Sequence, residues 1–140
     1  MRVVVPFICA GLLAVILMLS VQKFYKVAPT GERGKIANDI QFEVEKASDT
    51  ALNVRAIESK SVLATFQKGT FAYSVFRNLR SERKRNRVNI ESPFRLVRYE
   101  TGDLALKDLE TGSSVYIKAF GPSNAEAFNT LFAAGLLTPH

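Results

Sequence analysis

The pattern of hydrophobic and polar positions divides the chain into an apolar first segment and a longer part with strand and helix periodicity. Residues 3–21 carry no charge, and at about 1.5 Å per residue a helix of this length reaches roughly 28 Å, the thickness of a bilayer's hydrocarbon core. The stretch predicts a transmembrane anchor with an interfacial belt over residues 1–27. A cleaved signal peptide is disfavoured because its apolar core would be shorter. Ala10, Gly11 and Ala14 offer a small-residue face for packing against a neighbouring helix.

A linker and three strands are expected after the anchor. Residues 28–38 have the proline and glycine content of a linker. Ile40, Phe42 and Val44 then alternate with polar residues, and the same period of two returns at 52–56 and 62–66. Such alternation is typical of half-buried strands, so residues 40–66 predict a three-stranded antiparallel meander.

A helix is predicted to follow over residues 71–85, with Thr70 as its N-cap. At 100° per residue its apolar side chains gather on one side. The opposite side gathers one aromatic and four basic residues, Tyr73, Arg77, Arg80, Lys84 and Arg87. The segment 89–93 ends the helix, because the residue before a proline avoids helical dihedral angles.

The second half of the chain repeats this order of elements. Strands are predicted over residues 94–99, 104–109 and 114–120. A second helix then begins at a capping box formed by Ser123 and Glu126, and runs to about residue 134. Gly135 suits a left-handed helix stop.

A shift of 52 positions aligns the two halves. It places Phe42 on Phe94 and Phe76 on Phe128, which indicates a βββα unit used twice, with a pseudo-twofold axis. The expected fold is α+β: a single N-terminal transmembrane helix and, over residues 39–140, a small antiparallel β domain of about six strands with two packed helices.

The excess of positive charge is local. The chain carries a net charge of +6, and residues 77–87 hold six bases against Glu82. The predicted protein interface consists of Tyr73, Arg77, Arg80, Arg83, Lys84, Arg85 and Arg87. Such a surface could be merely solvated, bind anionic lipid headgroups, or pair with carboxylates of a membrane-protein partner. Nucleic acid is disfavoured because no binding motif is present.

Catalytic and metal chemistry find little support in the sequence. The chain has one cysteine, Cys9, and one histidine, His140, so no Cys/His metal cluster or internal histidine-based catalytic pair is expected. We expect no cofactor and no small-molecule substrate. A membrane-tethered enzyme would need an internal pocket with a perturbed acid or base.

Five motifs resemble one known family. They are Gly69-Thr70, the arginine-rich run Arg80 to Arg87, Pro93 to Leu96, Gly102 to Leu104, and Phe120 to Phe128. In this order, behind an N-terminal membrane span, they resemble PuhC, the photosynthetic complex assembly proteins of purple photosynthetic bacteria.

The resemblance implies a non-enzymatic membrane protein that supports the reaction centre and its core light-harvesting antenna, either leaving after assembly or remaining as a subunit. It also implies an inner, photosynthetic membrane and a periplasmic domain. The positive-inside rule alone would favour a cytoplasmic domain, because Lys23, Lys26, Arg33 and Lys35 outweigh Arg2.

The C-terminal motif of the resemblance has a structural interpretation. Its residues, Gly121, Pro122, Ser123, Asn124, Ala127 and Phe128, are expected to start the second helix and pack it on the sheet.

Overall fold

The computed structural model describes residues 34–138. The predicted anchor over residues 1–27, with its packing face of Ala10, Gly11 and Ala14, lies outside the described residues, as does His140. Between residues 34 and 138, no helix has both the length and the hydropathy of a membrane span.

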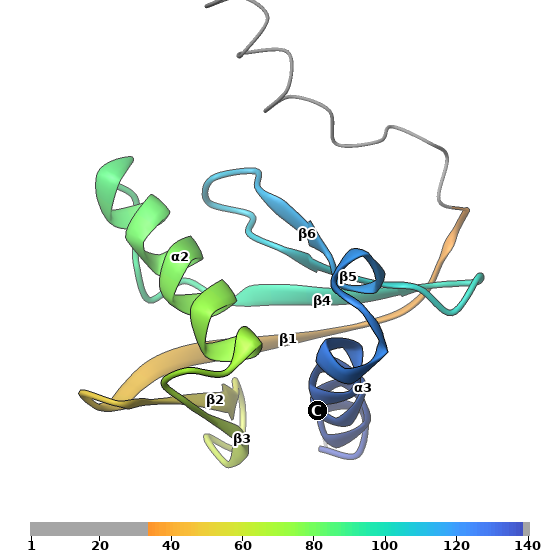
Figure 1. Ribbon diagram of the computed structural model, residues 1–140, viewed down its shortest axis with the longest axis horizontal. Helices are drawn as coiled ribbons and strands as arrows, with labels where there is room; N and C mark the ends of the chain where they lie inside the picture. Colours follow the sequence, from red (N-terminus) through yellow and green to blue (C-terminus); the bar gives the residue numbers. More distant parts are fainter. Residues whose placement is uncertain (1–33, 139–140) are drawn as a thin grey trace, which may run out of the picture. The chain divides into compact units, whose positions relative to one another are not determined.

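The described chain forms one antiparallel sheet and two α-helices in the order βββα–βββα. The strands are β1 (Ile36–Ser48), β2 (Ala51–Ala56), β3 (Val62–Gln67), β4 (Phe94–Tyr99), β5 (Leu104–Lys107) and β6 (Ser114–Tyr116). The helices are α2 (Phe71–Arg85), the 3₁₀ turn η1 (Ile117–Phe120) and α3 (Pro122–Leu136). The strands lie in the sheet in the order β3-β2-β1-β4-β5-β6, and Figure 1 shows the long β1 lying beside β2 and β4. The predicted α+β domain of six antiparallel strands and two helices is confirmed.

One face of the sheet carries the core, as the period of two predicts. Ile40, Phe42 and Val44 of β1 are buried, and both α-helices contribute to the same apolar cluster. The residues between them, Gln41 and Glu43, are exposed or half-buried. Alternation along β1 thus decides which of its faces the helices cover. β4 and β5 do not alternate strictly, since Val97, Tyr99 and Ala105 form a second, smaller buried cluster.

The duplication is visible in the strand pairing. Glu43 of β1 pairs with Arg55 of β2. Arg95 and Lys107, which stand 52 positions after Glu43 and Arg55, pair in the same way between β4 and β5. The two halves therefore share one register, and they meet where β1 pairs antiparallel with β4. This arrangement is the local pseudo-twofold relation that the sequence predicts.

Four phenylalanines form the centre of the core, and they are two pairs of repeat-related residues. Phe42 lies opposite Phe94 in the sheet, with ring centroids 6.5 Å apart. Phe76 of α2 and Phe128 of α3 have centroids 5.9 Å apart. All four side chains are fully buried, so the pseudo-twofold axis runs through an aromatic cluster that contributes dispersion energy as well as apolar burial.

Three boundaries differ from the sequence-based prediction. β1 begins at Ile36, so residues 36–38, expected in the linker, belong to a strand. β5 ends at Lys107 because Asp108 turns into the protein. β6 ends at Tyr116, and the chain continues as a 3₁₀ turn that buries Ile117.

Both expected ends of the second helix are wrong in detail. Gly121 is the N-cap of α3, with φ 89° and no side-chain cap bond, so the Ser123–Glu126 capping box does not form. Gly135 is a helical residue inside α3, which continues to Leu136. A Cβ at Gly135 would lie 2.5 Å from Ile40 Cδ1, so this glycine serves the close approach of α3 to β1 and does not stop the helix.

Candidate functional site

Helix α2 has the start that its sequence predicts. The hydroxyl of Thr70 accepts a hydrogen bond from the Tyr73 backbone N–H at 3.3 Å, which satisfies one free donor of the first turn. The helix ends at Arg85, and Arg83, Lys84 and Arg85 occupy its last turn, where positive charge is favoured by the helix dipole.

Arg83 is not an interface residue, and this corrects the prediction. Its side chain is 0% exposed and forms a two-pronged ion pair with Asp108, with Nε 2.9 Å and 3.0 Å from the two carboxylate oxygens. The guanidinium also lies 3.8 Å above the Phe94 ring. Its Nη atoms donate to three backbone carbonyls after the helix, those of Ile90, Ser92 and Pro93. Arg83 therefore fixes α2 and the segment after it to Asp108, the residue that follows β5.

The partner of Arg83 is held in its charged form. Burial of Asp108 by itself raises the pKa of the carboxyl group. The hydrogen bonds from Arg83 and from the Glu110 backbone N–H, together with the charge of Arg83, outweigh this effect, and the net pKa of Asp108 is lowered. The buried pair is therefore an ion pair at neutral pH.

Arg80 is also engaged within the domain. Its Nη1 donates to the Val44 carbonyl of β1, and its Nη2 donates to Glu91 Oε1 at 3.0 Å. The Arg80 side chain is only 18% exposed. Arg80 thus joins α2, β1 and the segment after α2. Its charge is therefore largely unavailable to a partner, unlike the exposed bases of the predicted interface.

Four of the predicted basic residues do remain exposed: Arg77, Lys84, Arg85 and Arg87. Among residues 34–138 their side chains form no ion pair or hydrogen bond with one another or with the rest of the domain. Arg87 lies beyond the helix in a left-handed turn with φ 56°, so it is not on the helical face where the sequence placed it. We refer to these four residues as the basic surface.

A groove runs beside the basic surface, between α2 and the β1–β2 hairpin. It has a volume of about 390 Å³. It is lined by Lys46, Ser48, Asp49, Leu52, Tyr73, Arg77, Arg80, Ser81, Lys84 and Ile90. Tyr73, Arg77, Arg80 and Lys84 come from the predicted interface. Lys46, Ser48, Asp49 and Leu52 were missed because only the tertiary fold brings the hairpin beside α2, and Ser81 and Ile90 carry no charge that would have marked them. We call this the α2 groove.

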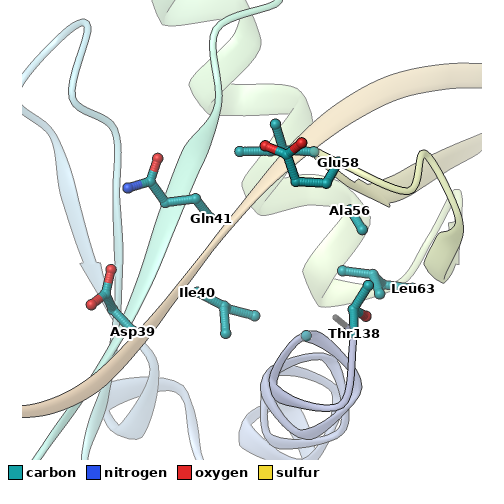
Figure 2. A pocket seen from close by; sticks show the side chains of 9 residues that line it. Asp39, Ile40, Gln41, Ala56, Glu58, Leu63 and Thr138 are labelled. Carbon is teal, nitrogen blue, oxygen red and sulfur yellow. The ribbon is translucent and has the colours of Figure 1, made fainter. Parts of the chain in front are cut away.

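A smaller hollow lies beside the C-terminal end of α3, and it has a volume of about 240 Å³ (Figure 2). Its apolar wall includes Ile40, Ala56, Leu63 and Gly135. Gly135 stands 52 positions after Arg83, and it brings no side chain to this wall, because Ile40 lies where its Cβ would be. We call this the α3 hollow.

The α3 hollow contains polar side chains but no convergent catalytic arrangement. In Figure 2 the carboxylates of Asp39 and Glu58 lie apart and do not point toward one another. Asp39 already accepts a hydrogen bond from Arg95 Nε at 2.7 Å. In the described part of the chain, no group of three or more His, Cys, Asp or Glu side chains is arranged to hold a metal ion.

The residues of the C-terminal motif lie in the first two turns of α3 and just before it. α3 begins at Pro122, after Gly121. Asn124 Nδ2 donates to the Phe120 carbonyl at 2.8 Å, which ties the first turn of α3 to η1. Phe128 is fully buried and Ala127 packs against the core, whereas Ser123 is exposed.

One of the three comparisons with known proteins finds a match. The family model PuhC, described as photosynthetic complex reorganisation protein, matches residues 37–135. Comparison with curated proteins gives no match, and neither does comparison with solved structures. The matched range runs from the second residue of β1 to the last but one of α3, and it includes α2 and the basic surface. The chain therefore belongs to the PuhC family of photosynthetic complex reorganisation proteins.

Proposed function

We propose that this protein is a membrane-anchored, non-enzymatic accessory factor that docks on the reaction centre–core antenna complex and supports its assembly or stability. The observation that carries the proposal is the basic surface. Arg77, Lys84, Arg85 and Arg87 are exposed and are not neutralised by acids of the described domain. Membership in a family of photosynthetic complex reorganisation proteins supports a partner of this kind.

The proposal includes a location. Residues 1–27 would anchor the chain in the bacterial inner membrane through packing of Ala10, Gly11 and Ala14 against a neighbouring helix. The domain would lie on the periplasmic side, next to the extramembrane surface of the complex. An anchor confines the domain to this surface, so weak contacts at the interface suffice for docking.

Electrostatic attraction would act mainly on the formation and specificity of the contact. Arginine forms two parallel hydrogen bonds with a carboxylate, and such pairs are stronger than neutral hydrogen bonds. Charges at the rim of an interface chiefly change the association rate and its dependence on salt. We therefore expect docking that weakens as ionic strength rises.

The test is charge reversal on the basic surface. The variant Arg77→Glu/Lys84→Glu/Arg85→Glu changes three exposed side chains without touching Arg80 or Arg83. A control, Lys35→Glu/Lys68→Glu/Lys118→Glu, changes the net charge equally at exposed positions outside α2, and of these only Lys118 has an acidic partner within residues 34–138, Asp103. Each full-length variant is incubated with purified reaction centre–core antenna complex, and co-purification is measured at low and high salt.

We expect the α2 variant to lose co-purification and the control to retain it. Equal recovery of the complex with both variants would exclude the electrostatic contact. An alternative is that the basic surface binds anionic lipid headgroups, at about 1 kcal/mol per base, but the family match gives no support to it. Vesicles containing phosphatidylglycerol measure that binding in the absence of protein partners.

A further inference from the structure

The α2 groove has both aliphatic and basic lining residues. Leu52, which is buried, and Ile90, which is half-buried, supply the aliphatic side chains, and Arg77 and Lys84 supply bases from α2. We propose that this groove binds an acidic helical segment of a partner protein, with one apolar side chain seated between the carboxylates that pair with Arg77 and Lys84. This inference rests on the proposed function and specifies the chemistry of the docked partner.

The fold itself does not require these basic residues, because the chain contains an internal comparison. In the second repeat, helix α3 lies in the position equivalent to α2. The positions 52 residues after Arg77, Arg80 and Lys84 hold neutral side chains, Asn129, Phe132 and Leu136. The position after Tyr73 holds Ala125. Since α3 packs on the same sheet without bases at the positions of Arg77 and Lys84, these two charges are additional to what folding needs. Arg80 and Tyr73, by contrast, bond or pack within the domain.

Two of the four bases in the groove are already paired. Lys46 Nζ lies 2.6 Å from an Asp49 carboxylate oxygen, and Arg80 is engaged by Glu91. Within residues 34–138, Arg77 and Lys84 have no such partner. These two side chains are therefore the ones available to a ligand in the groove.

The spacing of Arg77 and Lys84 defines the ligand. They lie seven residues apart on α2, which is about two turns and roughly 10 Å along the helix axis. Two acidic residues seven apart on a partner helix present carboxylates at the same spacing and on the same face. A helix laid along α2 could thus engage both bases and insert an apolar residue between them.

The same features favour a protein over a lipid surface. Recognition of anionic lipid typically uses clusters of four to eight bases close to the membrane. The basic surface as a whole holds four such bases, but the groove also has the aliphatic lining residues Leu52 and Ile90, which a lipid headgroup would not use. Aliphatic lining suits an aliphatic or aromatic anchor, the usual centre of a protein interface.

The test fills the groove without changing its charge. Ser81 lines the groove and is exposed, and Ser81→Trp places a large side chain there. Asn78→Trp is the matched control, because Asn78 is exposed on α2 and does not line the groove. Co-purification of each full-length variant with the purified core complex is measured against dilution. We expect at least about tenfold weaker binding for Ser81→Trp and unchanged binding for Asn78→Trp.

The outcomes separate the groove from the wider proposal. If charge reversal on the basic surface abolishes binding but Ser81→Trp does not, the groove is not the binding site and the proposed function stands. If neither variant reduces binding, both proposals fail. If both Trp variants weaken binding equally, the effect is not specific to the groove, and the inference also fails.

Photo-crosslinking identifies what occupies the groove. A benzophenone amino acid at position 81 is expected to crosslink to a segment of a core-complex subunit that carries acidic residues seven apart. A crosslink to lipid, or to a protein segment without acidic residues, would overturn the inference. The same group at position 78 provides the background level.

Discussion

The buried pair of Arg83 and Asp108 allows a quantitative prediction for Arg83→Met. Methionine keeps much of the side-chain length but removes the charge, which leaves Asp108 buried and unpaired. Removing one partner of a buried ion pair typically destabilises a protein by about 3–5 kcal/mol. The three carbonyls that Arg83 satisfies also lose their donors. We therefore expect a loss of about 4 kcal/mol, against a total stability of about 5–15 kcal/mol for a typical domain.

The assay is urea unfolding of the full chain at neutral pH, followed by circular dichroism. At an m-value of about 2 kcal/mol/M, a loss of about 4 kcal/mol lowers the midpoint by about 2 M. Arg77→Met is the matched control, because Arg77 is exposed and its replacement should change stability by less than about 0.5 kcal/mol. A loss below about 1 kcal/mol for Arg83→Met would refute the structural role of Arg83 and make it a candidate interface residue again.

A double-mutant cycle isolates the interaction between the two side chains. Replacement of both, Arg83→Met with Asp108→Leu, removes both buried charges at once. Apolar residues often replace a buried ion pair with little loss of stability. The double variant should therefore be at least about 2 kcal/mol more stable than the sum of the single effects predicts. Additive effects would show that the two residues are not coupled.

Two further predictions concern the same pair and its repeat-related position. The folded-state pKa of Asp108 is lowered. The ion pair therefore contributes stability above the usual carboxyl pKa of about 3.9, and this stability is lost as the pH falls through the lower folded-state pKa. Urea midpoints measured from neutral pH to about pH 2.5 should show this decline in the native chain and a weaker decline in Asp108→Asn, whereas parallel profiles would contradict the prediction. Gly135→Ala should lower stability by about 1–2 kcal/mol despite alanine's higher helix propensity, because the new Cβ would lie 3.2 Å from Ile40 Cβ, which no rotamer change can move. Thermal unfolding measures this loss, and Ile40→Val in the same chain should recover part of it. A gain in stability for Gly135→Ala would contradict the close packing of α3 on β1.

Much of the local structure could be predicted because it depends on neighbours in the sequence. The alternation at Ile40, Phe42 and Val44 sets the buried face of β1 whatever the strand pairs with. The Thr70 cap and the range of α2 follow from hydrogen bonds within one turn. The shift that places Phe42 on Phe94 predicted the shared register of the two halves.

The functional surface was predicted less accurately, because charge alone does not show whether a base is free. Arg83 stands four residues after Leu79 and seven after Phe76, so helical periodicity places it on the buried face. That signal was available in the sequence. The positive charge of Arg83 nevertheless suggested exposure, since an arginine is rarely buried without a partner.

The sequence by itself determined the βββα repeat, the buried face of β1 and the concentration of bases around α2, because these depend on the order and spacing of side chains. Only the tertiary structure decided which bases are available to a partner. Asp108 lies 25 positions after Arg83, and Glu91 lies 11 positions after Arg80. The two arginines are therefore paired by contacts that form only when the sheet, the helix and the segment after it have come together. Arg77 and Lys84 remain beside a groove that the β1–β2 hairpin completes.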